Sequence, residues 1–178
     1  MNNKMWNFTQ IRKWALEHPR NENNIKLTQA EEREWGNKMI GNTIKTTSQW
    51  TTKLGEHLVY EILNKQGLNP RRPKRTNHYS PDWETDDYMY EVKSRNWTTT
   101  GTAGEKVYGA PLKYAEVPEL YKKPLKIVCV AFQEYELTHG HTPILGPNIR
   151  PEQQKYVDFY NSNNIFYVPC SELINQLD

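Results

Sequence analysis

The chain has 178 residues, a formal net charge of +2 and a hydrophobic fraction of 36%. This length fits one globular domain, and the low apolar fraction predicts a modest core beneath an extensive polar surface. No run of about 18 apolar residues occurs, so we expect no membrane-spanning helix. The N-terminal stretch lacks an apolar segment, so we expect no secretory signal. We therefore expect a cytoplasmic protein with no membrane partner.

Two compositional features bear on partners and redox chemistry. Residues 132–178 hold six acidic and two basic residues, which leaves a net charge of +6 on residues 1–131. A local positive surface is what a polyanion requires, so this asymmetry permits a nucleic-acid partner. Cys129 and Cys170 form no CxxC pair, which argues against a disulfide framework or a zinc site, and Cys129 within IVCV is expected in the core.

The N-terminal part of the chain, about residues 1–50, is expected to be helical. Apolar residues recur near helical spacing between residues 6 and 18, and Pro19 follows them. Thr28 with Glu31 three residues later has the form of a capping box at the start of QAEEREWGNKMI. The clearest helix is residues 51–66, because five apolar side chains form one stripe before a C-cap glycine: Leu54, Leu58, Val59, Ile62, Leu63 and Gly67.

The second half of the chain alternates strands and helices. SPDWETDDYMYEVKSRNW is expected to form a β-hairpin with its turn at residues 85–87. An irregular helical portion follows, from residue 104 or 111 to about 121, which Pro118 interrupts or restarts. The apolar run at residues 125–132 predicts a central strand buried on both faces. A proline-containing loop, a helix at 152–160, the strand IFYV and a helix from Ser171 follow. The fold class predicted is α/β, with a central mixed β-sheet flanked by α-helices.

Three charged residues of the predicted hairpin carry the strongest functional signal. Alternate residues of a strand share a face, so Glu91 and Lys93 project the same way, with backbones roughly 7 Å apart, while Tyr90 and Val92 face the core. Asp82 adds a second carboxylate beside them. Anionic oxygen atoms are the ligands that a hard divalent cation requires.

The spacing of these residues resembles a known signature. Pro81-Asp82, eight intervening residues and then Glu91-Val92-Lys93 resemble the PD-(D/E)XK signature of restriction-type nucleases, and type II restriction endonucleases are the nearest group. Upstream, GEHLVYEILNKQGL resembles the helix that precedes the catalytic hairpin, whose early Glu often completes the metal site. Glu56 occupies that position.

The resemblance implies a restriction-endonuclease-like core at about residues 51–132, with an N-terminal helical addition at 1–50 and a C-terminal α/β addition at 133–178. It implies Mg²⁺-dependent hydrolysis of DNA at a short specific duplex site, leaving 5′-phosphate and 3′-hydroxyl ends. Asp82, Glu91 and the Val92 carbonyl would hold Mg²⁺, Glu56 would act through a water or a second metal, and Lys93 would orient the attacking water. Double-stranded DNA and a second copy of the chain in a homodimer are the expected partners.

Two segments supply candidate DNA contacts. The first is the basic run before the hairpin, where phosphates must pass: Arg71, Arg72, Lys74 and Arg75. The second follows the catalytic strand and offers donors and acceptors for groove or backbone contacts: Arg95, Asn96, Thr98, Thr99, Thr100 and Lys106. For both segments an ordinary structural loop is the alternative.

Other interpretations remain open at this stage. Asp82 is also suited to a turn, and Glu91 with Lys93 to a solvated strand face. Glu56 also suits the first turn of its helix, where the dipole favours negative charge. At the level of function, the rivals are another PD-(D/E)XK nuclease (a homing endonuclease, junction resolvase or repair nickase) and an inactive DNA-binding module.

Overall fold

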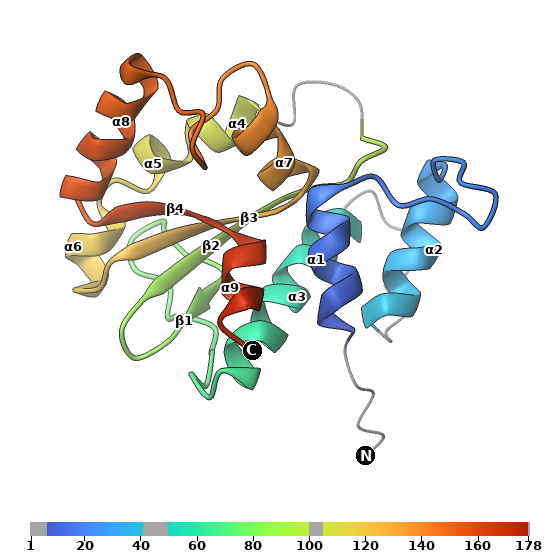
Figure 1. Cartoon of the computed structure of the whole chain (residues 1–178). Helices are drawn as coiled ribbons and strands as arrows, with labels where there is room; N and C mark the ends of the chain where they lie inside the picture. Colours follow the sequence, from blue (N-terminus) through green and yellow to red (C-terminus); the bar gives the residue numbers. More distant parts are fainter. Residues whose placement is uncertain (1–6, 41–49, 100–104, 178) are drawn as a thin grey trace.

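The computed structural model describes residues 7–40, 50–99 and 105–177 (Figure 1). The described residues form a four-stranded mixed β-sheet in the order β1-β2-β3-β4. Strand β1 is antiparallel to β2, and β2, β3 and β4 are parallel. The strand bounds are β1 Trp83–Glu84, β2 Met89–Arg95, β3 Leu125–Ala131 and β4 Ile165–Pro169. The predicted α/β class, the hairpin and the central position of β3 are confirmed.

One face of the sheet is covered by helices from both ends of the chain (Figure 1). They are α1 Phe8–Leu16, α3 Trp50–Lys65 and α9 Cys170–Asn175, with α2 Gln29–Ile40 packed against α3. The stripe of α3 packs on Tyr90 and Val92, as the alternation predicted. The capping box of α2 is also confirmed, since the Thr28 backbone N–H donates to Glu31 Oε2 at 2.8 Å. Gly67 has a φ of 77° beyond the end of α3, which a glycine adopts without strain.

The opposite face is covered by helices that follow β2 and β3 in the chain. They are α4 Glu105–Tyr108, α5 Ala110–Lys113, α6 Val117–Tyr121 and α8 Pro151–Ser162. The core on this face includes Met89, Ile127 and the buried Cys129. Among the described residues, no helix is both long and apolar enough to cross a lipid bilayer.

Helix α7, Phe132–His139, corrects the sequence analysis, which placed a loop directly after β3. The sequence FQEYELTH shows no apolar stripe because α7 buries polar side chains. Glu134 is 2% exposed and accepts a hydrogen bond from the Ser171 backbone N–H at 3.0 Å. Burial of this carboxylate raises its pKa. Because buried polar side chains produce no apolar periodicity, the hydrophobic pattern of the sequence does not predict this helix.

Candidate active site

The register of the hairpin brings the two predicted carboxylates together. Trp83 pairs with Tyr90, and extending this antiparallel register by one residue places Asp82 opposite Glu91 on the same face. Asp82 Oδ2 accepts a hydrogen bond from the Val92 backbone N–H at 2.7 Å. The hairpin turn instead lies at residues 85–88, closed by hydrogen bonds of Thr85. Asp82 lies at a bend directly before β1, so a turn-forming role for this residue stays open.

Glu91 is buried beneath an aromatic side chain. It is 5% exposed, so the solvated strand face considered for this residue is wrong. Its Oε1 atom accepts hydrogen bonds from Lys93 Nζ at 2.5 Å and from the Tyr114 hydroxyl at 2.7 Å. Tyr114 stands at the end of α5 and was missed, because it lies 23 residues from Glu91 in an irregular stretch. Its role is to fix one oxygen of the carboxylate.

Glu56 reaches the hairpin because α3 passes unusually close to β2. A Cβ atom on Gly55 would lie 1.6 Å from Ser94 Oγ, so only glycine permits this approach. The neighbouring Glu56 is buried, and its backbone carbonyl accepts a hydrogen bond from Trp83 Nε1 at 2.9 Å. The close contact therefore brings Glu56 near enough to Asp82 for its charge to act on the Asp82 carboxyl.

Arg72 connects the carboxylates from the basic segment. Its Nη2 atom lies 2.7 Å from Glu56 Oε2, and its Nη1 atom donates to the Asp82 carbonyl at 2.9 Å. Its guanidinium stacks over the Trp83 ring at 3.9 Å from the centroid. Arg72, which the sequence predicts to contact a phosphate, is thus already paired with Glu56 within the protein. Its side chain is still about half exposed.

The electrostatics of the cluster follow from this crowding. Burial, together with the charges of Glu91 and Glu56, raises the pKa of Asp82 to about 7, although the Val92 hydrogen bond and Lys93 act in the opposite direction. Near neutral pH, a substantial fraction of Asp82 is therefore protonated. Like charges at close range resist joint ionisation, and a cation placed among them would relieve the repulsion.

The donor chemistry of the cluster suits a hard divalent cation. Asp82, Glu91 and Glu56 offer only carboxylate oxygens, which Mg²⁺ prefers. In the described parts of the chain, however, no group of three or more His, Cys, Asp or Glu side chains stands in metal-binding geometry. Lys93 and Arg72 neutralise the carboxylates instead, so a bound cation would compete with these two side chains.

The remaining predicted basic contacts divide into paired and exposed residues. Arg71 forms ion pairs with Glu84 at 3.1 Å and Asp86 at 3.0 Å. The Arg95 side chain is only 10% exposed and reaches Glu136 at 2.9 Å. Of the predicted basic contacts, those that are exposed and form no ion pair with a described residue are Lys74, Arg75 and Lys106.

The loop after β2 is organised by a buried carboxylate that the sequence analysis missed. Glu32 of α2 is fully buried and accepts hydrogen bonds from Trp14 Nε1 at 3.0 Å and the Trp97 backbone N–H at 2.9 Å. It also accepts the Thr98 N–H and hydroxyl, at 3.1 and 2.8 Å, and Asn96 Nδ2 at 3.2 Å. These bonds favour the structural alternative for Asn96 and Thr98.

Two further predicted contacts in this loop complete the set. The Thr99 hydroxyl donates to Asn96 Oδ1, which keeps that side chain inside the loop as well. Thr100 lies outside the described residues. The loop thus ties the N-terminal helices to the carboxyl end of the strand that carries Glu91 and Lys93.

Comparison of the chain with family models, with curated proteins and with solved structures gave no match.

Proposed function

We propose that this protein is a Mg²⁺-dependent DNA endonuclease of the PD-(D/E)XK type, built on a restriction-endonuclease-like core and most similar in kind to type II restriction enzymes. The observation that carries the proposal is that Glu91 and Glu56 both lie near enough to Asp82 for their charges, with burial, to raise its pKa to about 7, while Lys93 contacts Glu91. Crowded, buried carboxylates cost stability, and a hairpin that serves only the fold has no need of them.

Each side chain has a role in this mechanism. Asp82, Glu91 and the Val92 carbonyl would hold Mg²⁺, with Glu56 acting through a water or a second ion. When bound, the metal supplies charge neutralisation at phosphorus and a more acidic water. Lys93 holds the attacking water and stabilises negative charge on the phosphoryl oxygens. The water oxygen would bond to phosphorus as the bond to the 3′-oxygen breaks. The attacking water would release a proton to solvent and the departing oxygen would take one up from solvent, which leaves 5′-phosphate and 3′-hydroxyl ends.

The exposed cations supply phosphate contacts in this proposal. Lys74 and Arg75 precede the hairpin in the sequence, and Lys106 lies on α4, which follows the hairpin. Arg71 and Arg72 remain about half exposed despite their ion pairs, and exposed pairs are weak enough to exchange partners. Binding through such contacts weakens steeply with salt.

Two isosteric or truncated variants test the proposal directly. Lys93→Ala and Asp82→Asn should each lower cleavage of a long mapped duplex by about 100-fold or more while duplex binding in Ca²⁺ is retained. Lys155→Ala, an exposed residue of α8, is the matched control and should cleave as the unmodified protein does. Undiminished cleavage by either site variant would reject the assignment. Discrete fragments would support a fixed short site, whereas preference for junctions or mismatches would support one of the other PD-(D/E)XK nucleases.

An inactive DNA-binding module is the second candidate. The observation that favours it is the neutralisation of Glu91 by Lys93 and of Glu56 by Arg72, which needs no metal. Titration with Mg²⁺ separates the two: strand scission that rises with Mg²⁺ supports the nuclease, and binding without scission supports the module. The proposed homodimer is tested separately by sedimentation with and without duplex DNA.

A further inference from the structure

The loop between α1 and α2 forms a short hairpin that presents two cations. Arg20 and Lys26 are paired in an isolated antiparallel bridge, and the Asn21 backbone N–H donates to the Ile25 carbonyl at 2.9 Å. Residues directly opposite in such a bridge project from the same face. Both cations are exposed, and neither forms an ion pair with any described residue. Arg20 is oriented by a 2.6 Å hydrogen bond to the Asn24 carbonyl.

A row of aromatic rings lies beside this hairpin. The His18 ring stacks on Trp97 with centroids 5.8 Å apart and an interplanar angle of 22°. Trp97 contacts Tyr135 at 4.9 Å, and Tyr135 stacks on His139 at 4.7 Å. Trp97 is held in place because its Nε1 atom donates to the Trp14 carbonyl at 2.7 Å. His18, Trp97 and Tyr135 are all partly exposed, so ring surface remains available.

The cations and the rings line the same hollow, which has a volume of about 270 Å³. Its lining residues are Leu16, Glu17, His18, Arg20, Lys26, Trp97 and Tyr135. The single carboxylate among them, Glu17, is paired with Lys13 at 3.1 Å. The hollow therefore combines an aromatic wall with an excess of positive charge.

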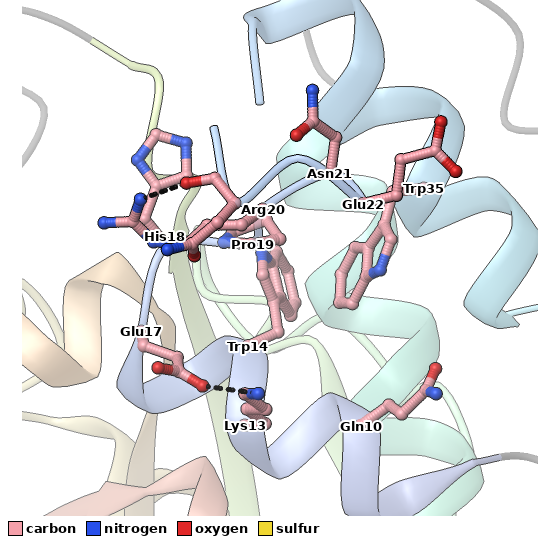
Figure 2. Close-up of a pocket in the computed structure, with 11 residues that line it drawn as sticks. Gln10, Lys13, Trp14, Glu17, His18, Pro19, Arg20, Asn21, Glu22 and Trp35 are labelled. Atoms are coloured by element: carbon pink, nitrogen blue, oxygen red, sulfur yellow. Dashed lines mark hydrogen bonds and ion pairs between the residues drawn. The ribbon is translucent and has the colours of Figure 1, made fainter. Parts of the chain in front are cut away.

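A larger pocket of about 550 Å³ shares Glu17, His18 and Arg20 with this hollow (Figure 2). Figure 2 shows the paired side chains of Lys13 on α1 and Glu17 directly after it, with the residues of the connecting loop around Trp14. Trp14 is only 3% exposed, so it offers little ring surface. The larger pocket also carries the carboxylate of Glu22, which disfavours a phosphate.

We infer that the smaller hollow binds an unpaired nucleotide, with its base against the rings of His18, Trp97 and Tyr135 and its phosphate between Arg20 and Lys26. Every base has a planar π face, so stacking on aromatic side chains does not depend on sequence. Two cations side by side are suited to one phosphate, which positions the nucleotide without reading it. Base-paired DNA keeps its bases stacked inside the helix and cannot fill the hollow.

This inference rests on the proposed nuclease function and specifies its substrate class. Trp97 follows Lys93 by four residues, so their backbones are at most about 14 Å apart. At about 3.4 Å per base step, this corresponds to no more than about four steps along a strand. An unpaired nucleotide in the hollow would then lie within a few steps of the phosphate to be cut, which favours flapped, branched or otherwise interrupted duplexes and, among the proposed nucleases, a junction resolvase or repair nickase over a type II restriction enzyme.

Binding without metal tests the site independently of cleavage. A labelled ten-nucleotide single strand, the same strand made fully abasic, and a blunt duplex are titrated in EDTA and followed by fluorescence anisotropy. The strand with bases should bind about 5- to 100-fold more tightly than the abasic strand, since stacking is the contact that the abasic strand lacks. Equal affinity for the two strands would overturn the inference.

Three variants assign the binding to this hollow. Lys26→Glu should weaken both strands about tenfold, whereas Tyr135→Leu should reduce only the preference for the strand with bases. Lys155→Glu on α8 makes the same change in net charge elsewhere and should have little effect. Equal weakening by Lys26→Glu and Lys155→Glu would overturn the site, and circular dichroism checks that each variant is folded.

Cleavage in Mg²⁺ separates this inference from the function on which it rests. Tighter binding of the strand with bases than of the abasic strand in EDTA, together with no Asp82-dependent cleavage, would reject the proposed nuclease activity and retain the nucleotide site. Asp82-dependent cleavage that proceeds equally on flapped and continuous duplexes would reject the nucleotide site and retain the nuclease. Faster cleavage of the flapped substrate, lost in Tyr135→Leu, supports both.

Discussion

Replacing Asp82 with asparagine should stabilise the metal-free protein at pH 8. In the folded state the pKa of Asp82 is about 7, compared with an ordinary value of 3.8. Between pH 3.8 and about 7 the native state keeps a proton on Asp82 that the unfolded chain has released. The free energy of unfolding therefore falls as pH rises from 3.8 to about 7, and at pH 8 the whole loss of stability is present. This sign is opposite to that of a carboxylate held by a favourable ion pair.

The structure sets the size of the effect. At about 1.4 kcal/mol per pKa unit, the difference corresponds to about 4 kcal/mol, and the 19% exposure of the side chain reduces it. Asparagine keeps an oxygen that can accept the Val92 N–H bond, so the substitution removes charge without removing this contact. We therefore expect a gain of about 2–4 kcal/mol in the free energy of unfolding.

Urea unfolding in EDTA at pH 8 and pH 4 measures this gain. The difference between variant and unmodified protein should be largest at pH 8 and small at pH 4, where the native carboxyl is already protonated. Added Mg²⁺ should stabilise only the unmodified protein and narrow the gap at pH 8. Asp87→Asn, an exposed position in the same hairpin, should change stability by less than about 0.5 kcal/mol. An Asp82→Asn variant that is no more stable at pH 8 would refute the crowding of these carboxylates.

Three further substitutions test other parts of the structure. Gly55→Ala should lower the free energy of unfolding by about 1–3 kcal/mol and reduce cleavage, because the added Cβ would clash with Ser94. Gly109→Ala is the control: its Cβ has room, so thermal unfolding should be nearly unchanged. Glu32→Ala leaves several buried donors unpaired and should cost about 3–5 kcal/mol in urea unfolding; a loss below 1 kcal/mol would show that the loop does not depend on it. Lys74→Ala should reduce the slope of log affinity for duplex DNA against log salt by about one, and an unchanged slope would remove its phosphate contact.

Local sequence patterns determined the elements and the direction of their side chains. The period of two in the hairpin put Glu91 and Lys93 on one face and Tyr90 on the other, and the capping box fixed the start of α2. These features are predictable because hydrogen bonds and burial within one helix or one hairpin depend on residues a few positions apart. The mixed sheet followed from the order of these elements.

Only the tertiary structure decided which partner each charged side chain found. Glu32 meets Trp97 from 65 residues away, and Arg72 pairs with Glu56 while its side chain stays about half exposed. In α7, Glu134 likewise accepts a hydrogen bond from Ser171, a residue 37 positions further along the chain. A polar group takes the partner that the packing of distant segments brings within about 3 Å, and no periodicity in the sequence records that distance.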